Sequence, residues 1–337
     1  MSPEPLDFRA LFTADLHLTT RPEDEYRWEI FTWLGTQGKA RNVDTIFILG
    51  DLTDRKDHHP AKLANALVDR LSDLAKTFQL VILKGNHDYV DPEWPFFRFL
   101  SKFPKIKFFS KPGEFTWGYD FLCLPHSNNW RSEWRGLKRE EYDFVLIHQA
   151  IGGAHTPTGF EVSGVPSSFF DRCDTVIAGD IHVPQQVGKV IYCGSPHPVD
   201  FGDDFQPRVL FWNGEALKSV KRTTLKKTVL RITDPKEIRK ADLTEGDQVR
   251  IVLRLPRSSL SDWTKLRAEA LAEASAAGLV ARAIEMEPLT ERPRLQPGER
   301  RQLGNNPASI FEQFCVEQKV AEDMIEVGRE LLKVEAK

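Results

Sequence analysis

The sequence predicts an α/β protein in which two sheets form a sandwich flanked by helices. Short apolar segments alternate with helix-like segments over the first 215 residues. These apolar segments are continuous rather than alternating, which is typical of strands that are covered on both faces. Fewer helices separate the later segments, and this indicates a second sheet packed on the first.

Eight apolar segments are predicted strands: Phe8–Thr13, Thr45–Leu49, Leu80–Leu83, Phe121–Leu124, Phe144–Ile147, Thr175–Ala178, Val190–Cys193 and Val209–Trp212. Helices are expected at Glu25–Ala40 and Pro60–Phe78. The second of these has one apolar face, because its leucines are spaced three or four residues apart, at Leu63, Leu67, Leu71 and Leu74.

The composition changes after about Gly214. Residues 218–231 (KSVKRTTLKKTVLR) hold six basic residues and no acidic one. A strand, a helix and a further strand are expected at Gln248–Leu255, Leu260–Ala277 and Leu279–Glu287. The sequence therefore predicts a core over residues 1–215 and a small β-β-α-β domain over 216–290. Residues 291–307 are rich in Pro, Arg, Gly and Asn and are a predicted linker, and residues 308–337 are a predicted amphipathic helical tail.

Composition and charge exclude several classes of protein. No apolar run approaches the ~20 residues that span a bilayer, and the N-terminus lacks the features of a secretory signal, so we expect a cytoplasmic protein with no membrane contact. The four dispersed cysteines form no CxxC pair and are expected to be reduced thiols. A net charge of -3 means that any DNA-binding surface would be local.

Polar residues that can bind metals follow five of the apolar segments. All nine histidines lie between His17 and His197. Carboxyl ends of neighbouring parallel strands lie about 4.8 Å apart, so side chains placed there converge. Alone, each such residue is more often a helix cap, a turn residue or a buried core group, but five in succession predict a metal site. The predicted ligands are Asp15, His17, Asp51, Asn86, His148, Asp180 and His182.

Seven ligands predict two metal ions. A single tetrahedral zinc takes four ligands, whereas two ions about 3.5–4 Å apart, bridged by one carboxylate, would use all seven. Asp51 is the expected bridge. Carboxylate, imidazole and amide donors without a thiolate favour Mn²⁺, with Fe²⁺ or Mg²⁺ also compatible.

These motifs resemble those of the calcineurin-like metallophosphoesterases: DLH at 15–17, GDLTD at 50–54, GNHD at 85–88, His148 at a strand end and GDIH at 179–182. Within that superfamily the chain resembles the SbcD-type nuclease subunits of bacterial or phage double-strand-break repair complexes. The narrower resemblance rests on YCGSPHPVDFGD at 192–203, on the small basic domain and on the linker with its helical tail. It is strong over residues 8–203 and weak after 215.

The resemblance implies a role for each site residue. One metal would be held by Asp15, His17, Asp51 and His182, and the other by Asp51, Asn86, His148 and Asp180. His87 would face the scissile phosphate as a catalytic residue, with Asp88 orienting its imidazole. The family usually has GHxH at the last motif, so Asp180 stands where a histidine is expected. A carboxylate ligates hard ions well, and we expect Asp180 to remain a ligand.

The resemblance also implies partners. It predicts a metal-dependent exonuclease and endonuclease that acts on double-stranded DNA ends, binds an SbcC-type ATPase through its tail and forms a homodimer through the nuclease domain. For the tail, packing on the core is the alternative. Expected DNA contacts come from the basic run, at Lys221, Arg222, Lys226 and Lys227, and from Arg131 and Arg135 in a tryptophan-rich loop. The alternatives are a solvated edge strand and loop packing.

Two other functions compete with the nuclease. The first is a stand-alone metallophosphoesterase acting on a small phosphodiester or a phosphoprotein. The segment GDLTDRK resembles the GDxxDRG of protein phosphatases, although Lys56 replaces the glycine. The second is a scaffold that has lost catalysis, and the presence of His87 argues against it.

Overall fold

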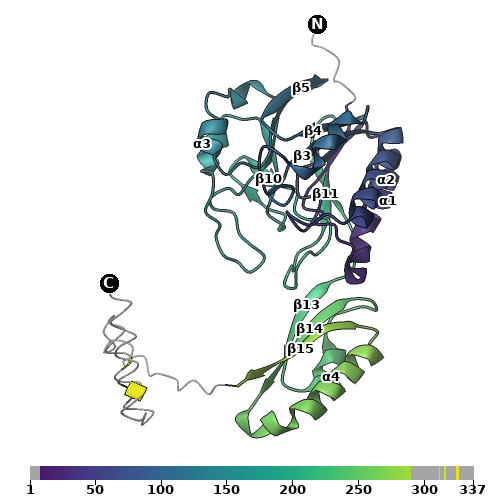
Figure 1. Ribbon diagram of the computed structural model, residues 1–337, viewed down its shortest axis with the longest axis vertical. Coiled ribbons are helices and arrows are strands. Elements are labelled where there is room, and N and C mark those ends of the chain that lie inside the picture. The colour runs from purple at the N-terminus through teal and green to yellow at the C-terminus, as the bar shows by residue number, and fades with distance from the viewer. Residues whose placement is uncertain (1–7, 290–310, 312–314, 316–323, 326–337) are drawn as a thin grey trace. The chain divides into compact units, whose positions relative to one another are not determined.

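A computed structural model describes residues 8–289 together with residues 311, 315, 324 and 325 (Figure 1). The chain divides into two compact units, Met1–Glu287 and Pro288–Lys337. The predicted linker lies outside the described residues, as does nearly all of the predicted tail. The boundary expected near residue 215 stays a prediction.

The first sheet has the strand order β12-β11-β1-β2-β3-β4. Its four strands from β1 to β4 are parallel, and β11 and β12 are antiparallel additions at one edge. The strands are β1 (Ala10–Thr13), β2 (Thr45–Ile48), β3 (Gln79–Leu83), β4 (Ile106–Phe109), β11 (Arg208–Trp212) and β12 (Leu217–Lys221).

The second sheet has the order β5-β6-β7-β8-β10-β9. Its central strands are parallel, and β5 and β9 pair antiparallel at the two edges. The strands are β5 (Gly113–Trp117), β6 (Tyr119–Leu124), β7 (Phe144–His148), β8 (Thr175–Gly179), β9 (Gln186–Val187) and β10 (Val190–Tyr192).

The two sheets pack face to face over an aromatic core. Phe12 and Phe47 of the first sheet stack with their ring centroids 4.6 Å apart, and Phe47 stacks on Phe121 of the second sheet at 5.3 Å. On β1, Phe12 belongs to this inner core, whereas Leu11 belongs to the outer one, as the alternation of side chains along a strand requires. The predicted two-sheet sandwich is confirmed.

Helices α1 (Glu29–Ala40) and α2 (Ala61–Thr77) cover the outer face of the first sheet and lie side by side (Figure 1). The four leucines predicted as one apolar face of α2 are all buried there. The predicted first helix differs at its start, because Pro22–Trp28 forms a 3-10 helix, η1, before α1 begins. The outer face of the second sheet packs against loops and short helices: α3 (Trp130–Glu133), η3 (Arg139–Glu141) and η4 (Ser167–Phe170).

A smaller sheet follows the sandwich, in the order β13-β14-β15. Strands β13 (Lys227–Ile232) and β14 (Gln248–Leu255) are parallel, and β15 is Val280–Pro288. Helix α4 (Trp263–Ala276) shares an apolar core with this sheet. The element order matches the predicted β-β-α-β pattern. The remaining short helices are η2 (Phe96–Lys102), η5 (Pro235–Lys240) and η6 (Arg257–Asp262).

The four cysteines are unpaired and buried, in agreement with the prediction of free thiols. Over the described part of the chain, no helix combines the length and the apolar character needed to cross a bilayer.

Candidate metal centre

The predicted ligands lie just beyond the carboxyl ends of five strands from both sheets. Strands β1, β2 and β3 of the first sheet lead into Asp15, Asp51 and Asn86. In the second sheet, β7 ends on His148, and β8 ends immediately before Asp180. Because the sheets are packed face to face, these strand ends meet, and the site is shared between two sheets rather than formed at the edge of one.

One group of ligand atoms gathers around His17. Its Nε2 lies 3.2 Å from His182 Nε2 and 3.5 Å from Asp51 Oδ2. These are residues expected to hold the first metal. Asp15, the fourth of that set, is fully buried, but its carboxylate gathers with Asp51 and His148 instead, with Oδ1 4.0 Å from His148 Nδ1.

A second group gathers around His148. Its Nε2 lies 3.1 Å from Asn86 Oδ1, 3.4 Å from Asp51 Oδ1 and 3.7 Å from Asp180 Oδ1. These are the residues expected to hold the second metal. Asp51 faces both groups through different oxygens, which is the arrangement that a bridging carboxylate needs.

The donor set fits divalent cations. Asp15 Oδ2 and His17 Nδ1 are buried and have no hydrogen-bond partner. The Asn86 amide oxygen lies among acceptors, and turning the amide would instead place its nitrogen 2.9 and 3.0 Å from the two Asp51 oxygens. Acceptors that converge in a buried site repel one another unless a cation lies among them. The convergence of carboxylate, imidazole and amide donors in one buried site therefore fits a divalent cation.

The ligand segments adopt a strained backbone. Among the described residues, five non-glycine positions have positive φ, and four of them are predicted ligands: Asp15 (57°), His17 (42°), Asp51 (54°) and Asp180 (92°). Such conformations cost about 1–3 kcal/mol each and concentrate at functional sites. Backbone hydrogen bonds between the ligand segments hold them in place, from Asp15 N to Gly50 O at 3.1 Å and from His17 N to Asp51 O at 3.0 Å.

Two glycines leave room for the ligands. A Cβ atom on Gly50, which has φ of 94°, would lie 2.1 Å from His148 Nδ1. A Cβ atom on Gly85 would lie 2.1 Å from Asp51 Oδ1. Both positions therefore exclude any side chain.

The buried carboxyl and imidazole groups shift one another's pKa values. Burial raises the pKa of Asp15 to about 6. Burial also acts to raise the pKa of Asp51, but the imidazole of His148 outweighs it and lowers that pKa below its usual range. Burial lowers the pKa of His17 well below its usual value. In His148 and His182, burial is opposed by Asp51 and Asp203 respectively, so the pKa of His148 rises and that of His182 reaches about 9.

His87 lies at the mouth of the site. Its ring centroid is 4.7 Å from that of His17, it is only partly buried, and its Nδ1 lies 2.7 Å from the carbonyl oxygen of Asp54. Ligand atoms of His87, His17 and Asp51 fall within 4.8 Å of one another, so the geometry also permits His87 to be a ligand.

Asp88 does not orient the His87 imidazole, and that expectation is wrong. The Asp88 carboxylate accepts hydrogen bonds from three backbone amides, those of Gly85 (2.7 Å), Asp51 (3.0 Å) and Leu52 (3.0 Å). Burial raises its pKa to about 7. Adjacent residues in a turn point in different directions, and Asp88 ties the GNHD turn to the Asp51 segment instead.

Two residues near the site were not predicted. Asp203 Oδ2 lies 3.6 Å from His182 Nδ1, at the distance of an ion pair with the protonated ring. Its signal was the final residue of the 192–203 motif. Arg27 is buried and donates from Nη1 to the His17 carbonyl at 2.5 Å, and nothing local in the sequence distinguishes this arginine from a surface one.

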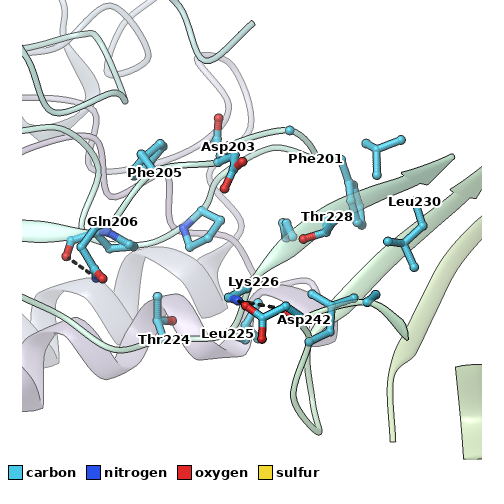
Figure 2. Close-up of a pocket in the computed structure, with 18 of the residues that line it drawn as sticks. Phe201, Asp203, Phe205, Gln206, Thr224, Leu225, Lys226, Thr228, Leu230 and Asp242 are labelled. Carbon is cyan, nitrogen blue, oxygen red and sulfur yellow. Dashed lines mark hydrogen bonds and ion pairs between the residues drawn. The ribbon is translucent and has the colours of Figure 1, made fainter. Parts of the chain in front are cut away.

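The predicted DNA contacts separate into buried and exposed residues. Arg222 is buried and donates to the Pro196 carbonyl, and Lys227 is buried against Asp24, so neither can reach a phosphate and both predictions are wrong. Lys221 is exposed on an edge strand. Lys226 is exposed and lies 3.4 Å from Asp242 in a hollow between residues 198–207 and β13 (Figure 2).

The tryptophan-rich loop is divided in the same way. Trp134 is buried and its ring contacts Phe169 and Phe170, so for this residue the alternative of loop packing holds. Arg131 and Arg135 are exposed, and Arg131 lies over the Trp130 ring at 4.6 Å. Both arginines stay predicted DNA contacts.

A family model for calcineurin-like phosphoesterases matches residues 8–184. This segment is more than half of the chain and contains all the predicted ligands. The chain belongs to the calcineurin-like phosphoesterase family, and it is accordingly a metal-dependent phosphoester hydrolase.

The chain is also similar to individual proteins. It is 25% identical to exonuclease subunit 1 of Enterobacteria phage T4 over 221 residues, which cover 60% of this chain and 63% of that protein. It is 40% identical to a UDP-2,3-diacylglucosamine hydrolase of Aromatoleum aromaticum over 84 residues, 24% of this chain and 33% of that protein. The chain thus spans less than two thirds of either relative.

Among solved structures, a purple acid phosphatase from yellow lupin (Lupinus luteus) matches with a TM-score of 0.42 and 11% identity. That match covers 64% of this chain and 51% of the lupin protein.

Proposed function

We propose that this hydrolase is a DNA nuclease, an SbcD-type subunit that processes double-strand ends in the cytoplasm together with an SbcC-type ATPase. The observation that carries the nuclease over other phosphoesterases is the similarity to the phage T4 exonuclease subunit. The converging metal ligands supply the chemistry that phosphodiester hydrolysis needs.

In this proposal the seven ligands hold two divalent ions, with Asp51 shared between them. When bound, such ions lower the pKa of water and polarise phosphoryl oxygens. Mn²⁺ is the proposed ion, because the donors are carboxylate, imidazole and amide without a thiolate. Asp180 contributes a carboxylate at the position where the family usually has a histidine.

His87 is the proposed catalytic residue of the protein. The Asp54 carbonyl accepts the hydrogen on His87 Nδ1, which fixes the tautomer and leaves Nε2 to exchange a proton. From the mouth of the site, Nε2 can stabilise charge on the scissile phosphate and protonate the leaving oxygen.

The surfaces proposed to bind partners are those where apolar or basic side chains are exposed. The segment after the GNHD turn exposes four large apolar side chains, with exposed fractions between 37% and 73%: Val90, Trp94, Phe96 and Phe99. An exposed apolar patch of this kind is typical of protein interfaces, and we propose it for the homodimer. Lys221, Lys226, Arg131 and Arg135 are the proposed DNA contacts, and the tail is the proposed ATPase-binding segment.

A nuclease assay on linear duplex DNA with Mn²⁺, with and without the ATPase subunit, tests the proposal. We expect cleavage by the wild type and none by His87→Asn, which should still bind Mn²⁺. The control variant is Asp73→Asn, at an exposed position on α2. Hydrolysis of small phosphodiesters without any cleavage of DNA would contradict the nuclease proposal and favour the stand-alone enzyme. The similarity to UDP-2,3-diacylglucosamine hydrolase supports that second candidate.

A further inference from the structure

We propose that Arg27 and Asp24 of η1, together with Lys227 of β13, are positioning residues for one of the two metals only. This metal is the one assigned to Asp15, His17, Asp51 and His182, called here the first metal. The inference rests on the proposed two-metal site. It assigns to the smaller sheet a side chain that acts on the metal centre.

Arg27 joins the segment that carries His17 to the segment that carries Asp203, whose carboxylate lies against the His182 ring. Its guanidinium is buried, with Nη1 donating to the His17 carbonyl at 2.5 Å and Nη2 donating to the Val199 carbonyl at 2.9 Å. The backbone of His17 is strained, with φ of 42°. The Val199 amide in turn donates to Asp203, whose carboxylate lies 3.6 Å from His182 Nδ1. A single rigid, planar group therefore fixes both segments.

Asp24 holds this guanidinium in place. Its carboxylate is 1% exposed and lies 3.0 Å from Arg27 Nη2 and 3.1 Å from Lys227 Nζ through Oδ1. Its other oxygen accepts hydrogen bonds from Arg21 Nε at 2.7 Å and from Thr19 Oγ1 at 3.1 Å. A buried carboxylate with partners on every side has one stable position, and that position sets where Arg27 lies.

Lys227 brings the smaller sheet into this cluster. It is the first residue of β13, and its Nζ donates to Asp24 Oδ1 and to the same Val199 carbonyl, at 3.0 Å. Two further contacts reach η1 from the smaller sheet, because Gln248 Nε2 donates to the Glu23 carbonyl at 2.6 Å and Arg282 pairs with the Glu23 side chain at 2.9 Å.

The two ligand sets are joined through Asp51 and through the Asp180 amide, which donates to Asp15 Oδ1 at 3.0 Å, but the second metal also has a support that does not pass through Arg27. His148 Nδ1 lies 2.6 Å from the Leu49 carbonyl, which belongs to the loop after β2. The contacts of Arg27 and Lys227 described above lead instead to the His17 and Val199 segments. Loss of the cluster should therefore weaken the first metal and spare the second.

Mn²⁺ titration of the metal-free, full-length protein, followed by calorimetry and electron paramagnetic resonance, tests this inference. Wild type should bind two ions and show the signal of an exchange-coupled pair. Loss of an orienting partner behind a ligand typically weakens metal affinity 10–100-fold. In Arg27→Met we expect one ion to keep its affinity and the other to bind roughly tenfold more weakly or worse. At intermediate Mn²⁺ the signal should become that of a single ion.

Two milder variants keep the test decisive if Arg27→Met fails to fold. Arg27→Lys retains the charge but cannot bridge both carbonyls, and Lys227→Met leaves Arg27 in place, so each should weaken the same ion by a smaller factor. Arg139→Met is the matched control, because Arg139 also donates to two carbonyls, those of Leu137 and Phe169, away from η1.

Unchanged affinity for both ions in the folded variants, or equal weakening of both, would overturn the inference. If wild type itself binds fewer than two ions, the proposed two-metal site fails instead.

Discussion

The sequence predicts a functional role for two sets of polar residues, the metal ligands and the basic segment 218–231. Folding brings the ligands together and separates the basic residues. The ligands come from distant segments, yet the packed strand ends bring them together. The basic residues are neighbours in sequence, and the fold separates them, since Arg222 and Lys227 are buried and Lys221 is exposed. Polar residues placed at strand ends predict a shared site, whereas a run of charge does not predict a shared surface.

The largest expected effect comes from Asp51→Asn. Asp51 faces both ligand groups, so the variant should lose tight binding of both ions, and hydrolysis should fall at least about a hundredfold. Metal stoichiometry and phosphodiester hydrolysis measured on the same preparation check this. A variant that retained two ions and activity would show that the two groups do not share a carboxylate.

Gly50→Ala should affect stability as well as metal binding. The new Cβ would collide with His148 at a backbone angle that already disfavours side chains, and we expect a loss of at least about 2 kcal/mol in the free energy of unfolding. Gly136→Ala is the matched control, because Gly136 also has positive φ but has nothing within 4 Å of the new Cβ. Urea denaturation should show a clearly smaller loss for the control. Equal losses would mean that backbone strain alone, without the His148 collision, explains the cost.

Metal uptake should release protons. Asp51 raises the pKa of His148 and Asp203 raises that of His182 to about 9, so we expect both rings to favour the protonated form at pH 7 in the metal-free protein. A ligating imidazole must be neutral, and about two protons should leave on binding. Affinity should therefore increase as the pH rises toward 9. Calorimetry in buffers of different ionisation enthalpy measures the number released, and a value of zero would contradict these protonation states.

The smallest effects separate the two kinds of basic residue. Lys221→Met should reduce the slope of log affinity for DNA against log salt by about 1, with stability unchanged. Lys227→Met should leave that slope unchanged and lower the free energy of unfolding by about 1–3 kcal/mol, because it removes a charged hydrogen bond from buried Asp24. If Lys227→Met changed the salt dependence of DNA binding instead, Lys227 would have to be exposed in the DNA-bound protein, which contradicts its burial here.

Much of the fold followed from local patterns. Buried parallel strands are continuous apolar runs, so β1, β2, β3, β7 and β8 were predictable with nearly correct ends. Strand β5 was missed, because GEFTW alternates exposed and half-buried residues at an edge. Strand β12 was missed because its residues were assigned to the charged segment. In the structure they pair with β11 at the edge of the first sheet.

The sequence was enough to predict which residues form the site, but not which atoms contact one another there. Asp15, Asp51 and His148 could be identified because each follows an apolar run, which is a property of a few adjacent residues. The hydrogen-bond partner of the His87 imidazole could not be predicted, because this partner is the Asp54 carbonyl and not the adjacent Asp88. Backbone carbonyls carry no sequence signal, so contacts through them are invisible before the chain is folded.

The order and chemistry of the ligands are determined by local sequence, because a strand followed by a carboxylate or imidazole can be recognised from a few adjacent residues. Which ligands face one another was decided by the packing of two sheets, since Asp51 meets both His17 and His148 only when the sandwich is closed. The burial of Arg27, Asp24 and Lys227 was decided at the same level. Their charges are stable in the interior because partners from three distant segments surround them, and no stretch of sequence contains that information.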